Sequence, residues 1–337
     1  MVSLKDIAKK CGVSIATVSK ALNDHHDISD ATKERLVRAA REMGYFPNSQ
    51  ARALKTNRTY NIGVMFSEEE GKGLSQEFFA RIISYFKDYC DNLGYDLTFV
   101  SSGFGKQKMS LYEHCKYRNV DGILLTSGDF TSPDVFEVIN GDIPVVTIDY
   151  IFESATTVMS SNEMGVEKLV DHVIKNGHTK IAYIQGLYTS VTKRRLQGFF
   201  KGCQKHGVEI NPDWIYKADY HNLEKAYIVT KQIMEKDEKP TCIFMPDDYS
   251  ALGGMRALTD MGYKIPEDVS VVGFDGISYS QLMNPRLTTY AQDTKTIGRL
   301  AAEKLINMIE QPETSFTEEI VVEGELYEGE TVKDLTK

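Results

Sequence analysis

The chain has none of the features that mark membrane-spanning, secreted or zinc-stabilised proteins. No stretch of its 337 residues approaches the roughly 18 consecutive apolar residues of a membrane span, and no apolar signal-peptide core stands at its start. The five cysteines form an odd set without a CxxC pair, which argues against a structural zinc site and against a disulfide framework. We therefore expect a cytoplasmic protein with reduced thiols, no metal, no cofactor and no membrane partner.

Sequence motifs of the common enzyme classes are also missing. No GxGxxG or Walker A motif follows an apolar run, and no GxSxG is present. One candidate for a catalytic base is His178, but it falls in a loop between a helix and a strand, on the sheet edge opposite the predicted ligand edge. A structural role explains His178 better, so we expect the protein not to be an enzyme.

Charge is distributed unevenly along the chain. Residues 1–58 carry 11 Lys and Arg against 6 Asp and Glu, a formal charge of +5, whereas the remaining 279 residues carry −14. A basic segment next to an acidic one indicates nucleic-acid contact, since clustered positive charge binds phosphates. Because many solvated helices are basic, charge alone does not establish nucleic-acid binding, and the residue pattern within the segment is needed as well.

The basic segment has the pattern of two short helices joined by a tight turn. Ser3 and Asp6 form a capping box at the start of the first helix. Gly12 supplies a turn residue, and Ser14 caps a second helix over about residues 15–23. This spacing is typical of a helix-turn-helix, whose second helix enters the major groove, although an ordinary αα-hairpin with a polar face fits it as well.

The second helix would present its exposed side chains to DNA. Lys20 can donate to guanine O6 and N7, and Ile15 or Ala16 can contact a thymine methyl group. The predicted contacts from this helix are Ser14, Ile15, Ala16, Thr17, Ser19, Lys20 and Asn23, with the hydroxyl groups placed for phosphates. A third helix, capped by Ser29, completes the head.

Short motifs along this segment occur in a long, ordered string. They are Asp6-Ile7-Ala8, Gly12-Val13-Ser14, Ala16-Thr17-Val18-Ser19-Lys20, Leu22-Asn23, Gly44-Tyr45, Pro47-Asn48 and Ala51-Arg52-Ala53-Leu54. The string closely resembles the DNA-binding head of the lac repressor (LacI/GalR) family. The resemblance implies a helix-turn-helix domain over 1–47 and a hinge helix with linker over 48–59. One departure is Lys20, where the family more often has Arg, and a lysine is a point donor rather than a fork.

The resemblance also implies a role for the hinge segment. In the family this segment orders on operator DNA in the minor groove, where the leucine matching Leu54 wedges into the central base step. Such a wedge kinks the duplex, and a polar segment this short should not be a stable helix alone. The predicted hinge contacts are Asn48, Ala51, Arg52, Leu54 and Lys55. The alternative is that Leu54 is a linker residue packed on the body.

From residue 60 onward, apolar strand-like runs alternate with amphipathic helical stretches. The predicted strands are 61–66, 96–100, 122–126, 145–148, 180–185, 241–245 and 269–274, and the main helices are 78–93, 165–176, 194–206, 225–236 and 249–261. Strict alternation of this kind predicts a parallel sheet with helices on both faces. Ligands of such sheets bind beyond the carboxyl ends of the strands.

Polar side chains stand at those strand ends. Asp149, Asp247, Asp248 and Asp275 each follow a predicted strand, and Arg195 lies near the start of a helix. Carboxylates that accept and a guanidinium that donates suit the recognition of sugar hydroxyls. Taken singly, an Asp at a strand end is also a common helix cap or turn former.

The body contains a second set of motifs that resembles the effector-binding core of the same family. They are Asp121-Gly122-Ile123-Leu124-Leu125, Pro144-Val145-Val146, Gly177-His178-Thr179-Lys180-Ile181-Ala182, Arg195-Leu196-Gln197-Gly198-Phe199, Asp248-Tyr249-Ser250-Ala251-Leu252-Gly253 and the stretch from Pro266 to Asp275. The resemblance implies a periplasmic-binding-protein-like body of type I, with two doubly wound α/β subdomains joined by three crossovers. Their predicted ranges are 60–161 with 292–320 and 162–291 with 321–330, followed by a tail over 331–337.

The effector is expected in the cleft between the two subdomains. Carried over by position, the predicted effector contacts are Phe78, Asp149, Arg195, Tyr220, Asp247 and Asp275. Aromatic faces suit the apolar side of a sugar ring. At position 247 the family more often has Asn, so Asp247 would accept rather than donate a hydrogen bond.

Together these observations predict a sequence-specific transcriptional regulator, a repressor of carbohydrate-utilisation genes controlled by a small sugar-type effector. The resemblance implies a homodimer that reads a pseudopalindromic operator. Two alternatives remain. One is a carbon-catabolite-type global regulator controlled by a phosphoprotein partner. The other is a sugar-binding transport protein, which shares the body architecture but is not expected to have the DNA-binding head.

Overall fold

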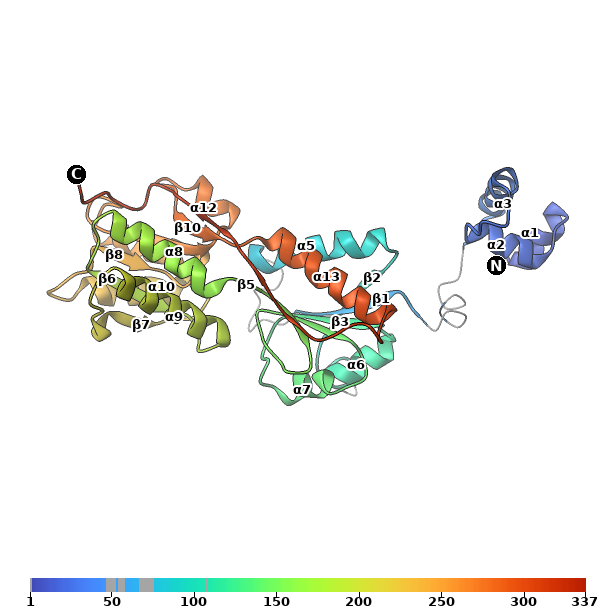
Figure 1. The fold of residues 1–337 in the computed structure, drawn as a ribbon, viewed down its shortest axis with the longest axis horizontal. Helices are drawn as coiled ribbons and strands as arrows, with labels where there is room; N and C mark the ends of the chain where they lie inside the picture. Colours follow the sequence, from blue (N-terminus) through green and yellow to red (C-terminus); the bar gives the residue numbers. More distant parts are fainter. Residues whose placement is uncertain (1, 47–52, 54–57, 67–75, 107) are drawn as a thin grey trace. The chain divides into compact units, whose positions relative to one another are not determined.

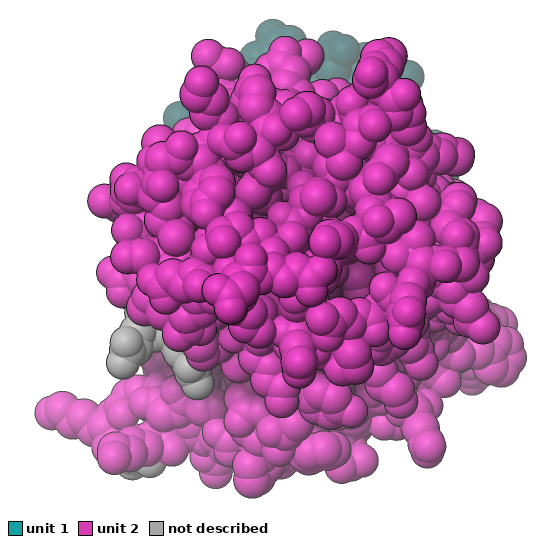
Figure 2. All heavy atoms as spheres, turned by 90° about the vertical axis from the view of Figure 1, so that its left-hand side faces the viewer, with its two compact units in different colours: residues 1–59 teal, residues 60–337 magenta. Residues whose placement is uncertain are grey.

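A computed structural model of the 337-residue chain describes every residue except 1, 47–52, 54–57, 67–75 and 107 (Figure 1). The chain divides into two compact units, the head (residues 1–59) and the body (residues 60–337). Figure 2 shows the heavy atoms of the body, residues 60–337, in magenta. Among the described residues, no helix has the length and apolar character needed to cross a membrane.

The head is a bundle of three helices, α1 (Leu4–Cys11), α2 (Ile15–Leu22) and α3 (Asp30–Glu42). The predicted capping box is present, because the Ser3 hydroxyl accepts from the Asp6 N–H while the Asp6 side chain accepts from the Ser3 backbone. Ser29 precedes α3 as predicted, but its hydroxyl bonds the Thr32 hydroxyl at 2.9 Å instead of a backbone N–H. The three helices bury a small core that contains Ile7, Val18, Ala21, Leu36 and Ala40.

The first subdomain of the body is built on a six-stranded parallel sheet in the order β11-β5-β4-β3-β1-β2. Its strands are β1 (Asn61–Phe66), β2 (Asp96–Val100), β3 (Gly122–Ser127), β4 (Val145–Ile148), β5 (Thr156–Ser160) and β11 (Glu319–Val322). Helices α5 (Glu77–Asn92) and α13 (Thr294–Glu310) pack on one face of the sheet. Helices α6 (Leu111–Arg118) and α7 (Pro133–Ile139) pack on the other.

The second subdomain repeats this architecture with the strand order β12-β10-β9-β8-β6-β7. Its strands are β6 (Ile181–Gln185), β7 (Ile215–Lys217), β8 (Cys242–Phe244), β9 (Ser270–Asp275), β10 (Thr288–Ala291) and β12 (Glu325–Tyr327), with β12 antiparallel to β10. Helices α8 (Asn162–Lys175) and α9 (Ser190–Lys205) cover one face. Helices α10 (Leu223–Met234) and α11 (Asp248–Asp260) cover the other, and the short α12 (Ser278–Leu282) follows β9. The predicted doubly wound fold is therefore confirmed.

The chain passes between the subdomains three times, after β5, after β10 and after β11 (Figure 1). The predicted change of subdomain after residue 320 falls inside β11, because Val321 and Val322 still pair with Met159 and Ser160 of β5. The end of the chain packs on the second subdomain, where Leu335 donates its N–H to the Asn176 carbonyl at 2.8 Å. The other predicted subdomain boundaries stay predictions.

All seven predicted strands occur to within one residue at each end, and the five predicted helices begin up to four residues earlier than expected. The strands β5, β7, β10, β11 and β12 were not predicted. These strands are three to five residues long, and β5 and β10 each begin with two consecutive threonines. The sequence therefore contains no apolar run that would predict them. Four of the five cysteines lie buried and free, as expected of small core residues.

Candidate DNA-reading surface and effector cleft

The outer face of α2 carries the side chains predicted to reach DNA. Ser14, Ile15, Ala16, Lys20 and Asn23 are exposed, and Ile15 has 48% of its surface accessible. Exposing this much of an isoleucine side chain to water is unfavourable. Contact with a thymine methyl group removes that apolar surface from water and is therefore favourable. The surface is therefore suited to the major groove, as the second helix of a helix-turn-helix should be.

Hydroxyl and amide groups at the two ends of α2 are partly committed to the helix itself. The Ser14 hydroxyl accepts from the Thr17 N–H at 3.0 Å and bonds the Thr17 hydroxyl at 2.8 Å. The Asn23 side chain donates to the Ser19 carbonyl at 2.7 Å. These groups keep spare hydrogen-bonding capacity for phosphates, so their predicted contacts stay predictions. The predicted hinge contacts Asn48, Ala51, Arg52, Leu54 and Lys55 lie outside the described residues.

In the body, Arg195 of α9 is the central polar group, with only 5% of its surface exposed. Its Nε donates to Asn162 Oδ1 and its Nη1 to the Pro246 carbonyl, both at 2.8 Å. Its Nη2 lies 3.7 Å from Asp275 Oδ1, and the guanidinium carbon stands 3.7 Å from the centre of the Phe274 ring. A guanidinium held by two hydrogen bonds and a ring face is rigid, and it keeps further N–H groups that can donate.

Asp275, the last residue of β9, lies beside Arg195 at the carboxyl end of its strand. Gln292, on the second crossover, donates from Nε2 to Asp275 Oδ1 at 2.7 Å. Burial raises the pKa of Asp275 well above its ordinary value, although Arg195 opposes that rise. The buried Gln292 Oε1 accepts no hydrogen bond from any described residue. Sequence reasoning missed Gln292, because it belongs to none of the quoted motifs.

Asp247 and Asp248 begin α11 and have different roles. Asp247 is the N-cap, and its carboxylate accepts from the Ser250 N–H at 2.7 Å, the Ser250 hydroxyl at 2.8 Å and the His221 N–H at 2.9 Å. Asp247 therefore caps a helix, which is the alternative to ligand contact for an Asp at a strand end. Asp248 is fully inside the protein, where it accepts from the N–H groups of Gly276 and Ile277. Burial raises the pKa of Asp248 to about 7.

Asp149 and Tyr220 complete the predicted group around Arg195. Asp149 follows β4, is half-buried and accepts from the Ser160 N–H at 3.2 Å, and loss of solvation raises its pKa. Tyr220 is also half-buried, and its ring centre lies 5.5 Å from the Arg195 guanidinium carbon. A Cβ on Gly186 would lie 2.3 Å from the Tyr220 ring, so a glycine is required there.

Phe78 does not belong to this group. Its side chain is buried in the core between the first sheet and α13, which corrects its predicted contact with the effector. The next residue, Phe79, has its ring centre 6.3 Å from that of His221 in the second subdomain. Successive side chains of a helix point about 100° apart. Neighbouring residues of α5 can therefore face different surroundings, Phe78 the core and Phe79 the second subdomain. Phe79 therefore replaces Phe78 in the candidate site.

His221 brings a further ionisable ring to the site. Its ring and the carboxylates of Asp247 and Asp275 offer ligand atoms that all lie within 4.8 Å of one another. Such a cluster of acceptors can hold a cation or the hydrogen-bond donors of a small molecule. By contrast, His178 is buried and bonds the Thr241 hydroxyl and the Lys333 carbonyl, both at 2.9 Å, which confirms its structural role.

Several hydrogen bonds join the two subdomains around this group. The Ser190 hydroxyl donates to the Asp149 carbonyl at 3.2 Å, and His221 Nδ1 lies 3.2 Å from Gln76 Oε1. The two oxygens of Glu77 accept from the Ser278 N–H. These contacts tie the two subdomains of the body together.

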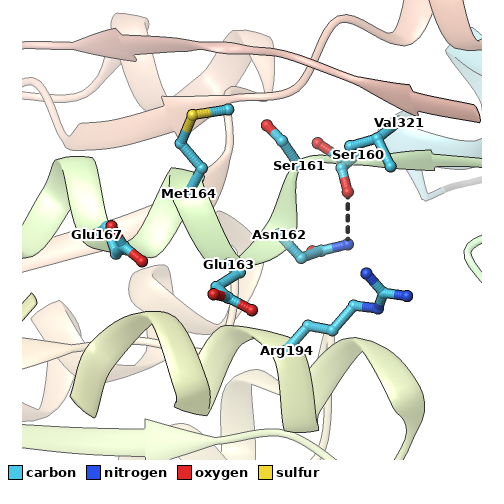
Figure 3. Close-up of a pocket in the computed structure, with 8 residues that line it drawn as sticks. All are labelled: Ser160, Ser161, Asn162, Glu163, Met164, Glu167, Arg194 and Val321. Carbon is cyan, nitrogen blue, oxygen red and sulfur yellow. Dashed lines mark hydrogen bonds between the residues drawn. The ribbon is translucent and has the colours of Figure 1, made fainter. Parts of the chain in front are cut away.

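A small surface pocket of about 200 Å³ lies beside the first crossover (Figure 3). It is lined by Ser160, Ser161, Asn162, Glu163, Met164, Glu167, Arg194 and Val321. Asn162 donates to the Ser160 carbonyl at 3.1 Å, and its Oδ1 holds Arg195. Asn162 thus connects the crossover between the subdomains to the central guanidinium.

The three-helix head with an exposed second helix, joined to a two-subdomain body with a buried polar cluster around Arg195, defines a DNA-binding transcriptional regulator with a ligand-binding domain. The chain belongs to the LacI family. Residues 3–48 match the family described as bacterial regulatory proteins, lacI family, and residues 170–332 match the periplasmic binding protein-like domain.

Similar proteins support the same class over the full length of the chain. The chain is 32% identical to the HTH-type transcriptional repressor PurR of Vibrio cholerae serotype O1 (strain M66-2), with all of both chains covered. A lac repressor dimer bound to operator and the anti-inducer ONPF superposes with a TM-score of 0.81 at 26% identity, covering 98% of this chain and 99% of that one. A complex of the regulator CelR with cellobiose gives a TM-score of 0.74 at 26% identity, covering 98% and 100%. A transport protein does not fit these matches.

Proposed function

We propose that this protein represses carbohydrate-utilisation genes and is controlled by a small sugar-type effector bound between the two subdomains of its body. The observation that carries the proposal is the buried Arg195, held at the carboxyl ends of the strands with Asp275 beside it. The structural relative CelR was solved in complex with cellobiose, which supports a sugar as the effector. The effector contacts proposed are Phe79, Asp149, Arg195, Tyr220, Asp275 and Gln292, with Asp247 and His221 adjoining them.

The charges of the cleft favour an effector without negative charge. Asp149 and Asp275 interact with a single guanidinium, that of Arg195, which already binds Asn162 and the Pro246 carbonyl. A phosphate or carboxylate placed here would have this one guanidinium to bind and would be repelled by every carboxylate of the group that is ionised. Hydroxyl groups instead donate to the carboxylates and to Gln292 Oε1 while accepting from Arg195. A neutral polyhydroxylated molecule therefore fits the site.

Control of DNA binding follows from the two-subdomain construction. We propose a homodimer that reads a two-fold pseudopalindrome in the bacterial cytoplasm, as resemblance to the lac repressor dimer supports. An effector that binds one arrangement of the subdomains more tightly shifts the population toward it. The coupling is reciprocal, so operator DNA must change effector affinity by the same factor as effector changes operator affinity.

The test begins with an operator selected in vitro by the full-length protein from randomised duplexes. Operator affinity is then measured against a panel of neutral sugars, their uronic acids and their phosphates. We expect at least one neutral sugar to change operator affinity by about tenfold, in line with typical coupling energies. Arg195→Ala should remove the response and keep operator binding, whereas the exposed Arg299→Ala should keep both. A normal response from Arg195→Ala, or a response to anionic sugars alone, would show that the proposed site is wrong.

A further inference from the structure

Lys20, predicted to read a base, is paired with an acid in the structure. Its Nζ donates to the carboxylate of Asp27, and both side chains are about half exposed. Lys20 is the one basic residue of α2, whose sequence is IATVSKAL. The face offered to DNA therefore carries a donor with an acceptor beside it, rather than a lone cation.

The turn that holds Asp27 is well anchored. The His25 N–H donates to the Lys20 carbonyl at 3.0 Å, which ties the turn to the end of α2. From the other side, Lys33 of α3 bonds Asp24 Oδ1 at 2.7 Å, with only 15% of the lysine side chain exposed. The hydrogen bond from Lys20 lowers the pKa of Asp27, so this carboxyl group is ionised at neutral pH. Asp27 is thus a fixed acceptor next to the reading helix.

A donor beside an acceptor matches the edge of one base pair in the major groove. Guanine presents the acceptors O6 and N7, and the paired cytosine presents its N4 amino donor directly next to O6. In an A·T pair the order differs, because adenine presents an amino donor at N6 and thymine an acceptor at O4. A lysine over the purine and an aspartate over the pyrimidine therefore fit G·C and meet like groups when the same orientation carries A·T. In the T·A orientation the lysine still meets thymine O4 and the aspartate adenine N6, so T·A differs from G·C by the loss of the second lysine bond, to guanine N7.

We propose that Asp27 is a specificity-determining residue, and that Lys20 and Asp27 together read a single G·C pair. Lys20 donates to guanine O6 and N7, while Asp27 accepts from cytosine N4. This inference rests on the proposed role of α2 as the base-reading helix. Asp27 also disfavours non-specific binding to DNA. If Lys20 binds a phosphate in place of a base, the Asp27 carboxylate is left near the negatively charged backbone and is repelled by it.

The test uses full-length wild-type protein and three variants of known charge. Wild type, Asp27→Asn, Lys20→Met and Asp30→Asn each select duplexes from a randomised library, and affinities for the selected site and its single-pair changes are then measured. Asp30→Asn is the matched control, since Asp30 is exposed at the start of α3, 3.8 Å from Lys33, and its loss changes the charge equally. We expect Asp27→Asn to lose about tenfold discrimination at one G·C pair in each half-site. Asp30→Asn should raise affinity for all sequences alike.

The outcomes separate this inference from the assignment on which it rests. If Lys20→Met loses the G·C preference while Asp27→Asn keeps it, α2 reads bases and the paired reading is wrong. If both variants keep the wild-type preference at every position, then α2 is not the base-reading helix and the joint reading of a base pair by Lys20 and Asp27 is also wrong. A wild-type protein that selects no sequence would overturn both. An affinity change in Asp27→Asn that is uniform across sequences, as in Asp30→Asn, leaves only a charge effect and also rejects the proposal.

Discussion

The Glu77 carboxylate, in the first subdomain, accepts the backbone N–H of Ser278, in the second, with its two oxygens 2.9 and 3.0 Å from that nitrogen. The Ser278 hydroxyl donates to the same carboxylate at 2.8 Å. Arg81, one turn along α5, reaches the Gly276 carbonyl at 3.5 Å. This part of α5 therefore binds the segment that follows Asp275, so closure of the subdomains and the environment of Asp275 are physically linked.

Removing the Glu77 carboxylate should loosen this connection. In Glu77→Ala, the Ser278 N–H loses its acceptor, and hydrogen exchange of the 276–282 segment should rise about fivefold, the equivalent of roughly 1 kcal/mol for a partly exposed hydrogen bond. The measurement is amide exchange by mass spectrometry on the full-length protein without effector. Glu303→Ala, which removes an exposed acid from α13, is the control and should leave this segment unchanged. Unchanged exchange in Glu77→Ala would mean that the contact does not hold the subdomains.

Arg195 should matter for stability as well as for response. Replacing it with Met leaves the Asn162 amide oxygen, the Pro246 carbonyl and the Asp275 carboxylate without their shared partner. Breaking a buried pair of this kind costs about 3 kcal/mol. Chemical denaturation should show this loss, against a change within about 0.5 kcal/mol for Arg299→Met on the surface of α13. An unaltered midpoint for Arg195→Met would show that the buried guanidinium is not fixed as described.

Asp248 should make the stability of the body depend on pH. Burial raises its folded pKa from 3.8 to about 7, so the folded state favours the protonated form. Its contribution is fully present below pH 4 and is lost as pH rises to about 7, by up to about 4 kcal/mol. Asp248→Asn keeps the shape and removes the titration. The free energy of unfolding of wild type minus that of Asp248→Asn should therefore fall between about pH 4 and about pH 7. A constant difference would contradict the raised pKa.

Leu54 should affect DNA binding alone. If it wedges into the central base step, as family resemblance implies, Leu54→Ala should weaken operator binding by about tenfold or more, because the kinked duplex loses the apolar group that holds it. Effector affinity measured without DNA should be unchanged. The comparison needs an operator-binding titration and a calorimetric titration with the same protein preparation. Equal losses in both would favour the alternative, a linker residue packed on the body.

Local rules predicted much of the fold. Apolar runs located seven strands, and capping residues located α1 and α2, because a buried strand and a helix start each leave a signature within a few residues. Resemblance to the family brought Arg195 and Asp275 into one site, and the structure places them 3.7 Å apart. The strands β10, β11 and β12 left no such signature, since each is short and held by neighbours distant in sequence.

The sequence by itself determined the class of this protein: a basic helix-turn-helix head, a doubly wound body, and carboxylates with one arginine at the strand ends. Only the tertiary structure decided which neighbouring residue faces which way. It placed Phe78 in the core and the Phe79 ring near His221. It showed that Asp247 caps the start of α11. It also paired Gln292 with Asp275, and Asp27 with Lys20. The physical reason is that secondary structure follows from local periodicity. A contact such as that between Gln292 and Asp275 depends instead on the packing of segments that the linear order of residues does not bring together.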